Sequence, residues 1–470
     1  GVALTPEREI VRIGVQPSKV RPATYVQLAD LLGIDTASLR ERVSAAQPDW
    51  FVSVIDLRTP AYERLRAELL KVPGITIDTA QRALAPTAEW GRAILGTVAP
   101  ATAETLGSAG PYALATDEVG DSGLQFAYQE RLAGTPGITI ELVEKARDDN
   151  VLNEVLSRRP TPGQPLPTSL HLGAQDAAER AVSEATETTS AVVVKASTGE
   201  ILAAANAPGP TSYNTAFIGR YAPGSTFKAV SAAALLTNDL VTTGTTVQCP
   251  DTTVVGGKRF KNYDPGITSG QPTFAQAFAA SCNTTLVGYA DELTGDQLAA
   301  TAEDFGFEAA WDLGLPAFSG SVPADADLVT RAADMIGQGK VESSPLMMAM
   351  VAAAIDSGVS RTPTLLPGLL PGSRLRELDP AIVEELQQMM RLVVTDGTGK
   401  AIDLPGVPVH AKTGTAEYLD GDRIRTNAWM IGYRGDIAFA VLIENGTSGS
   451  RDAAPIVSSL LANLPDDLYR

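Results

Sequence analysis

The stretch Pro223-Gly224-Ser225-Thr226-Phe227-Lys228 decides how the rest of the chain is interpreted. A Pro-Gly turn signal leads directly into an apolar, alanine-rich segment, 229 to 236, that predicts a helix. Lys228 then lies one turn beyond Ser225 on the same face, where its amine can reach the hydroxyl. A lysine can activate a serine only when burial or a neighbouring cation keeps the amine neutral. Taken alone, the pattern also fits a serine N-cap followed by a solvated lysine.

Two further short motifs follow along the chain. Ser281-Cys282-Asn283 lies near the end of a segment with helical periodicity. Lys412-Thr413-Gly414-Thr415 suits an edge strand beside a cleft, because its glycine would let a substrate backbone approach closely. Each motif alone is weak, and Ser-x-Asn recurs at Ser212-Tyr213-Asn214. The three motifs in this order and context together indicate a nucleophilic serine at position 225.

The composition excludes several other classes of protein. The 470 residues carry a formal net charge of −18, which argues against a nucleic-acid partner. The two histidines, His171 and His410, exclude a histidine-rich metal site and leave a Ser-His-Asp mechanism without a well-placed base. A phosphate-binding P-loop and a Gly-x-Ser-x-Gly elbow are absent from the sequence as well. We therefore expect neither a metal nor a cofactor.

Hydrophobic patterns divide the chain around a proline-rich segment. Residues 1 to 159 alternate strand-like runs with charged helical stretches, an α+β pattern without a catalytic constellation. Prolines stiffen residues 160 to 168, which we interpret as a linker. Residues 169 to 470 predict an antiparallel sheet covered by helices, with an all-α subdomain between its strands. In this region the patterns predict a single helix over 273–286 and strands at 169–172, 191–195, 201–205, 427–433 and 436–444.

These features together resemble a class B penicillin-binding protein, a D,D-transpeptidase of bacterial peptidoglycan synthesis. The hairpin around Thr198-Gly199-Glu200-Ile201-Leu202-Ala203 and the nucleophile segment 221 to 228 are similar to those of the family. Later landmarks are similar at 336–339, 394–399 and 429–433, so the likeness covers 169 to 470 almost completely. The resemblance implies the penicillin-binding, β-lactamase-like transpeptidase fold for this region.

The region before the linker shows a weaker likeness. Residues 120 to 137 resemble part of the family's non-catalytic, dimerisation-type pedestal domain, which separates class B from a lone β-lactamase domain. The Arg/Gly-rich segment that usually opens the pedestal is not reproduced in residues 4 to 20. We therefore expect upstream residues to be missing from this chain.

The resemblance implies a role for each motif residue in forming the acyl-enzyme. Ser225 would attack the carbonyl between two D-alanines of a stem peptide, with Lys228 as its base, and D-alanine would leave. Ser281 would pass a proton to the leaving amine, while Asn283 would hold Lys228 and the substrate amide. An amine from a second stem peptide would then convert the acyl-enzyme into a cross-link.

The third motif would bind and polarise the substrate. The backbone N–H groups of Ser225 and Thr415 would form the oxyanion hole. Lys412 would supply positive potential, and the hydroxyls of Thr413 and Thr415, on either side of Gly414, would bind the terminal carboxylate.

The resemblance also implies partners and a compartment. The substrates would be stem peptides ending in D-Ala-D-Ala, β-lactam antibiotics would acylate the same serine, and a glycosyltransferase is a further candidate partner. The protein would act at the extracytoplasmic face of the bacterial membrane, held by an anchor that lies outside this chain. Two alternatives stay open: a β-lactam sensor that is acylated once and signals, and a serine β-lactamase, which needs a group that activates the deacylating water.

The two cysteines, Cys249 and Cys282, have neither a metal-ligand spacing nor a Cys-x-x-Cys spacing. An extracytoplasmic compartment would permit a disulfide between them, which would hold the segment with Ser281 and Asn283 near the nucleophile helix. Two separate buried thiols, packed like small apolar side chains, are the alternative.

Overall fold

The computed structural model describes residues 1–144, 147–208, 213–263, 270–370 and 374–469. The chain divides into two compact units, Gly1–Ala88 and Glu89–Arg470. The domain boundaries inferred from the sequence, at 159 and 168, fall inside the second unit and stay a prediction. Within the described ranges, no helix combines the length and the apolar character that crossing a membrane requires.

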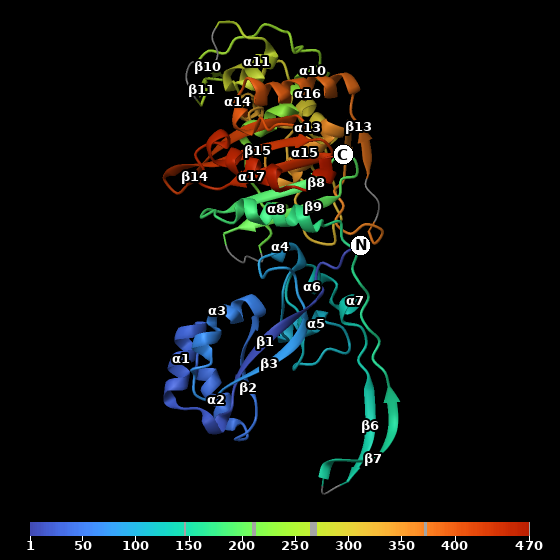
Figure 1. Ribbon diagram of the computed structural model, residues 1–470. Helices are drawn as coiled ribbons and strands as arrows, with labels where there is room; N and C mark the ends of the chain where they lie inside the picture. The colour runs from blue at the N-terminus through green and yellow to red at the C-terminus, as the bar shows by residue number, and fades with distance from the viewer. Residues whose placement is uncertain (145–146, 209–212, 264–269, 371–373, 470) are drawn as a thin grey trace. The chain divides into compact units, whose positions relative to one another are not determined.

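The first unit is a three-stranded antiparallel sheet packed against helices (Figure 1). Its strand order is β2 (Val52–Arg58), β1 (Glu7–Val15) and β3 (Ile75–Ala83). Its helices are α1 (Pro22–Leu32), α2 (Ala37–Ala45) and α3 (Thr59–Leu69). Alternation along β1 directs Ile13 and Val15 into the core, where Leu28 of α1 and Leu39 of α2 join them.

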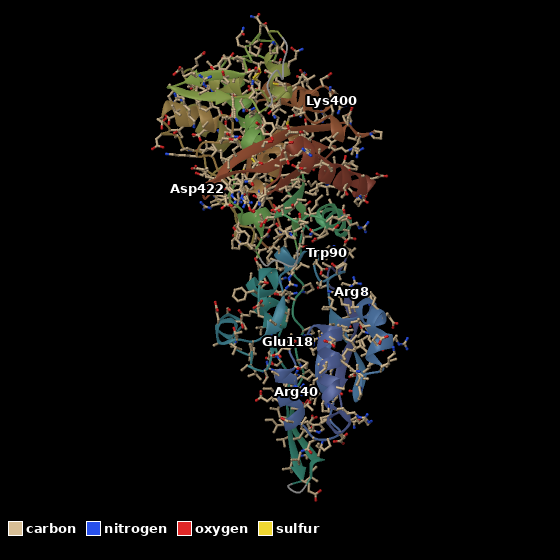
Figure 2. All side chains as sticks on the ribbon, turned by 90° about the vertical axis from the view of Figure 1, so that its left-hand side faces the viewer. Arg8, Arg40, Trp90, Glu118, Lys400 and Asp422 are labelled. Carbon is tan, nitrogen blue, oxygen red and sulfur yellow. A yellow bond between two sulfur atoms is a disulfide. The ribbon has the colours of Figure 1, made fainter. Side chains whose placement is uncertain are left out.

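The second unit opens with short elements and a long hairpin. The helices are α4 (Arg92–Leu95), α5 (Ala103–Ser108), α6 (Gly123–Ala127) and α7 (Gln129–Ala133), and the strand pairs are β4 (Val98–Pro100) with β5 (Glu118–Gly120) and β6 (Ile138–Glu144) with β7 (Arg147–Arg158). The side chain of Trp90, labelled in Figure 2, is buried, and its Nε1 donates to Asp176 Oδ1 at 2.6 Å. This contact joins the segment before α4 to the helix that carries Asp176.

A five-stranded antiparallel sheet forms the centre of the second unit (Figure 1). Its strand order is β14 (Val409–Asp420), β15 (Arg423–Arg434), β16 (Ile437–Ile443), β8 (Thr189–Lys195) and β9 (Ile201–Ala207). Helices α8 (Leu172–Val182) and α17 (Ala454–Asn463) pack on one face, and α15 (Pro345–Ser357) packs on the other. Every residue of β16 is buried, because helices cover both faces. The predicted helix-covered sheet, and the edge position of the strand with Lys412, are confirmed.

A mostly helical region lies between β9 and β14 in the sequence. Its helices are α9 (Thr215–Ile218), α10 (Lys228–Thr237), α11 (Phe274–Ala279), α12 (Asn283–Gly288), α13 (Gly295–Asp304), α14 (Leu328–Asp334), α15 and α16 (Pro380–Thr395). Two small hairpins, β10 (Thr252–Val255) with β11 (Lys258–Lys261) and β12 (Val359–Arg361) with β13 (Leu375–Glu377), interrupt the helices. Small alanine side chains allow α10 to be buried along nearly its whole length.

Two elements inferred from the sequence are wrong. Residues 169–172 form no strand, because the N–H of Ser169 donates to Leu365 O at 2.9 Å and α8 begins at Leu172. The single helix over 273–286 is instead two helices, α11 and α12. The chain breaks between them because Ser281 has a φ of 61°, which lies outside the right-handed helical region.

A disulfide joins Cys249 to Cys282 across a sequence separation of 33 residues. Cys282 is fully buried and directly precedes α12, so the bridge ties the start of that helix to the segment before β10. The choice that the sequence left open, between a bridge and two thiols, is resolved as a bridge in this structure.

We expect the double variant Cys249→Ala/Cys282→Ala to lose roughly 3–4 kcal/mol of unfolding free energy, because its unfolded chain lacks the closed loop. Denaturant titration measures the loss. The wild-type chain under reducing conditions is the matched control, since it loses the bridge but keeps both side chains. Titration of two free thiols in the denatured, unreduced wild-type chain would contradict the bridge.

Candidate active site

Ser225 lies in a short 3₁₀ turn, η2 (Gly224–Phe227), that leads into α10. Backbone contacts fix this turn from two sides. Gly224 has a φ of 54°, and a Cβ there would lie 2.5 Å from Thr415 O of β14. Gly337 has a φ of 69°, and its carbonyl oxygen accepts a hydrogen bond from Gly224 N at 2.8 Å. A Cβ at Gly337 would clash with Gly224 O, at a distance of 2.1 Å. Both positions therefore require glycine, and the serine is held at a fixed place beside the edge strand.

Lys228 is fully buried below this turn. Its Nζ donates to Ser281 O at 2.6 Å and to Asn283 Oδ1 at 2.7 Å, and lies 3.3 Å from Ser281 Oγ. None of these hydrogen bonds reaches Ser225. Burial, and then the positive charge of nearby Lys412, hold the pKa of Lys228 well below its ordinary value. A neutral amine has two N–H groups, which match the two short contacts and leave the nitrogen lone pair for a proton.

Ser281 lies between two lysines. Lys412 Nζ donates to Ser281 Oγ at 2.9 Å and to Thr413 O at 2.9 Å. Lys412 is also fully buried, and burial lowers its pKa to about 7. Burial therefore favours the neutral form of this lysine, so the positive potential that the sequence attributes to it is weaker than an exposed lysine would supply.

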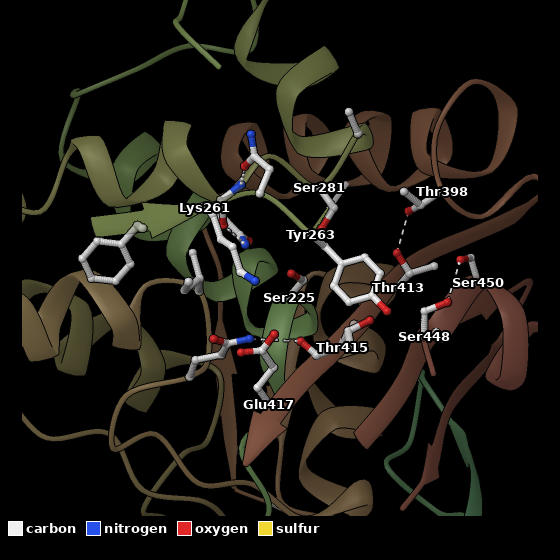
Figure 3. A pocket seen from close by; sticks show the side chains of 18 of the residues that line it. Ser225, Lys261, Tyr263, Ser281, Thr398, Thr413, Thr415, Glu417, Ser448 and Ser450 are labelled. Atoms are coloured by element: carbon white, nitrogen blue, oxygen red, sulfur yellow. Dashed lines mark hydrogen bonds between the residues drawn. The ribbon is translucent and has the colours of Figure 1, made fainter. Parts of the chain in front are cut away.

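The motif residues meet at a cleft of about 500 Å³ (Figure 3). Six of them line it: Ser225, Ser281, Asn283, Thr413, Gly414 and Thr415. Lys228 and Lys412 are fully buried beneath the residues that line the cleft. Both amines contact the cleft-lining hydroxyl of Ser281. The two cysteines contribute no lining atoms and act only on the backbone that carries Ser281.

Hydroxyl groups gather beside Lys412. Thr398 Oγ1 and Thr413 Oγ1 are 2.5 Å apart. Ser448, directly before η4 (Gly449–Ala453), and Ser450, within it, line the same part of the cleft. Hydroxyl donors next to a lysine suit a carboxylate ligand. The segment 394–399 was singled out in the sequence, but Ser448 and Ser450 belong to no motif and were missed.

Asn262 is a further residue that sequence reasoning missed. It is buried, and its Nδ2 donates to Pro250 O at 3.0 Å. Its Oδ1 accepts the N–H groups of Asn283 at 2.8 Å and Thr284 at 3.2 Å, which are unsatisfied donors at the start of α12. Asn262 thus holds the backbone that positions the Asn283 side chain. A single asparagine after a short strand has no sequence pattern that would have revealed this contact.

Three comparisons agree with this arrangement. A family model of the penicillin binding protein transpeptidase domain matches residues 189–462, and a model of the penicillin-binding protein dimerisation domain matches residues 1–168. A chain of a solved structure, described as structural coordination of polymerization and crosslinking by a peptidoglycan synthase complex, superimposes with a TM-score of 0.76 at 25% identity, covering 99% of this chain and 88% of that one.

Curated relatives are similar over different lengths. The peptidoglycan D,D-transpeptidase PbpA of Mycobacterium tuberculosis is 30% identical over 273 residues, which cover 52% of this chain and 55% of the relative. The peptidoglycan D,D-transpeptidase MrdA of Acinetobacter baumannii is 25% identical over 491 residues, covering 91% and 72%. The chain thus spans about half the length of the first of these relatives. Because the two family models match consecutive parts that together make up most of its length, the chain belongs to the class B penicillin-binding proteins.

Proposed function

We propose that this chain is a D,D-transpeptidase that cross-links peptidoglycan stem peptides through an acyl-enzyme on Ser225. One observation carries the proposal: two fully buried lysines, Lys228 and Lys412, both contact the hydroxyl of Ser281 at the cleft that Ser225 lines. Burying two amines without a carboxylate is costly unless they are at least partly neutral, and a neutral amine is what a serine nucleophile needs. The relatives PbpA and MrdA, named as D,D-transpeptidases, support the same reaction.

In the acylation step, Ser225 Oγ attacks the carbonyl carbon between the two D-alanines and its proton passes to Lys228 Nζ. The C–N bond then breaks, and Ser281 Oγ delivers a proton to the departing amine of D-alanine. Ser281 can regain a proton from either lysine, since its Oγ lies 2.9 Å from Lys412 Nζ and 3.3 Å from Lys228 Nζ. The acyl group stays on Ser225 until the amine of a second stem peptide attacks it and restores the free serine.

The edge strand supplies binding and charge stabilisation. Gln338 Nε2 donates to Thr415 O at 3.4 Å, on the cleft side of β14. Because the N–H and C=O of one strand residue point the same way, Thr415 N–H also faces the cleft and pairs with Ser225 N–H as an oxyanion hole. The hydroxyls of Thr413 and Thr415 bind the terminal carboxylate, whose negative charge favours the protonated form of Lys412.

The proposal extends to partners and location. Stem peptides ending in D-Ala-D-Ala are the substrates and β-lactams acylate Ser225 in their place. The likeness to a chain from a complex described as coordinating polymerization and crosslinking supports a glycosyltransferase partner. Both reactions belong at the extracytoplasmic face of the membrane, where peptidoglycan lies.

We expect a chromogenic cephalosporin to give a burst of about one equivalent and then almost no turnover, because a transpeptidase must keep water from its acyl carbonyl while it waits for an amine. Stopped-flow absorbance measures the burst. Intact mass spectrometry measures the adduct, which should persist for minutes. Sustained turnover of many equivalents would instead make the chain a β-lactamase. In that case Asp396 and Glu417, the two carboxylates on the cleft wall, are the candidate bases to replace.

The β-lactam sensor is separated from the transpeptidase by a second measurement. A transpeptidase releases D-alanine from a stem-peptide mimic, whereas a sensor only accumulates the β-lactam adduct. Release that depends on an added amine acceptor would support the full reaction.

A further inference from the structure

The segment 336–339, Ile-Gly-Gln-Gly, is a landmark of the sequence to which the proposed mechanism assigns no chemical step. It lies just beyond the end of α14. Gly337 O accepts the hydrogen bond from Gly224 N at 2.8 Å, and Gly224 directly precedes the nucleophile. From the next position, Gln338 Nε2 donates to Thr415 O at 3.4 Å. Two consecutive residues of one segment thus contact the nucleophile turn and the edge strand.

These contacts lie next to the two backbone N–H groups of the proposed oxyanion hole. One N–H belongs to Ser225, the residue after Gly224, and the other belongs to Thr415. The hydrogen bonds at Gly224 N and Thr415 O therefore hold the two stretches of backbone that carry these donors. Negative charge develops on the oxygen only in the transition state, and its stabilisation depends on donors that are already in place. A segment that sets the spacing of these donors acts on the rate of acylation without touching the substrate.

Asp334, the last residue of α14, closes the loop that contains this segment. Its side chain is buried, and its Oδ1 accepts a hydrogen bond from Lys340 N at 2.5 Å. A Cβ at Gly339 would lie 2.1 Å from the same oxygen, so the glycine makes room for the carboxylate. Burial raises the pKa of Asp334, and the C-terminal end of a helix also disfavours a negative charge. The hydrogen bond to the returning chain is what favours an aspartate at this place.

A further contact fixes the start of the loop. Met335 O accepts a hydrogen bond from Ser231 Oγ at 2.8 Å, and both residues are fully buried. Ser231 lies one turn beyond Lys228 on α10. The loop 335–340 is therefore bonded to the nucleophile helix, the nucleophile turn and the edge strand, and Asp334 closes it.

We propose that the loop 335–340 is a spacer that sets the distance between the two oxyanion donors, with Asp334 and Gln338 as positioning residues. This inference rests on the proposed function. Gln338 holds the Thr415 side of the hole, and Asp334 keeps the loop in the shape that reaches both sides. The sequence of the segment then has a physical explanation. Its two glycines permit close contacts that a Cβ would block, and the glutamine between them reaches the strand.

The first test is Gln338→Met, which keeps an unbranched side chain of similar length and removes the N–H donor. Acylation by a chromogenic cephalosporin is followed by stopped-flow absorbance at rising drug concentration. This separates the dissociation constant of the initial complex from the rate constant of acylation. We expect the rate constant to fall about fivefold, as for the loss of one neutral hydrogen bond, and the dissociation constant to stay unchanged.

The pair Asp334→Ala and Asp334→Asn tests the closure of the loop. Alanine removes the oxygen that accepts Lys340 N, so the rate constant should fall by about tenfold to a hundredfold, up to the loss of one oxyanion donor. Asparagine keeps a carbonyl oxygen at that place, so its rate constant should stay within about threefold of the wild type. Thermal unfolding checks that each variant folds. If the alanine variant does not fold, Gln338→Met still decides the proposal.

A boronic acid gives an independent measure of the hole, because its adduct with Ser225 is a tetrahedral anion that places an oxygen there. Its affinity for Gln338→Met should weaken by about the same factor as the acylation rate constant. Lys340→Ala is the matched control. It changes an exposed side chain in the same loop and keeps the backbone N–H that Asp334 accepts, so both measurements should match the wild type.

Three outcomes are decisive. Unchanged acylation and boronate affinity in Gln338→Met would overturn the spacer while acylation itself stands. A higher dissociation constant with an unchanged rate constant would also overturn it, because Gln338 would then bind the substrate and not position the hole. Failure of the wild type to be acylated at all would instead overturn the proposed function.

Discussion

Ser225→Ala should gain no adduct mass with benzylpenicillin under conditions that fully label the wild-type chain. The Ser225 hydroxyl oxygen forms the bond to the drug, and Ser225 is the cleft-lining serine in the turn that leads into α10, the helix that begins at the buried Lys228. Intact mass spectrometry measures the loss. Peptide mapping of the labelled wild type should place the adduct on the peptide that contains Ser225.

Ser450→Ala is the matched control for this variant. Ser450 also lines the cleft, but its recorded hydrogen bond goes to Ser448 and not to a lysine. We expect the Ser450→Ala chain to be acylated completely by benzylpenicillin, as the wild type is. A Ser225→Ala chain that still gained one equivalent of adduct would end the proposed mechanism.

Lys228→Met should lower the second-order acylation rate by about 10²–10⁴-fold, the usual contribution of a positioned general base. Methionine keeps an unbranched chain in the buried space and removes the proton acceptor. The rate is measured with the same penicillin, and thermal unfolding of the variant checks that the fold persists. Residual acylation is expected to require higher pH, where hydroxide can replace the missing base.

Lys228→Arg and a pH profile separate a base from a mere positive charge. Arginine keeps a cation but is not deprotonated in proteins, so we expect it to be as slow as methionine. In the wild type, acylation should fall as pH decreases through the depressed pKa of Lys228, because the amine becomes protonated. A Lys228→Arg rate within tenfold of the wild-type rate would contradict the role of Lys228 as base. So would a Lys228→Met chain whose acylation rate still falls at low pH as in the wild type.

The sequence was a reliable guide where a short pattern specifies local geometry. The Pro-Gly turn before Ser225, the alanine-rich helix after it and the edge strand around Gly414 each follow from residues within one element, and the structure places them as expected. The family resemblance then ordered the three motifs around one cleft, which no periodicity could have done.

The remaining features depend on contacts between distant segments. Helical periodicity continues through 273–286, so nothing local marks the left-handed Ser281 that splits the segment. The burial of Lys412 follows from its place between the sheet and the turn at Ser281, and the sequence alone had suggested a lysine at the cleft surface. Asn262 acts through the backbone of α12, which lies about twenty residues away in the chain, at 283 and 284.

The interlocked glycines at the nucleophile turn have a consequence for how bacteria could evolve antibiotic tolerance. A side chain at Gly224 or Gly337 would collide with backbone atoms, which cannot move aside as a flexible side chain can. Selection for resistance therefore cannot use these two positions beside Ser225. Adaptive substitutions that slow drug capture while sparing wall synthesis have to arise in the surrounding walls, where an exposed position such as 450 accepts a new side chain without disturbing the serine.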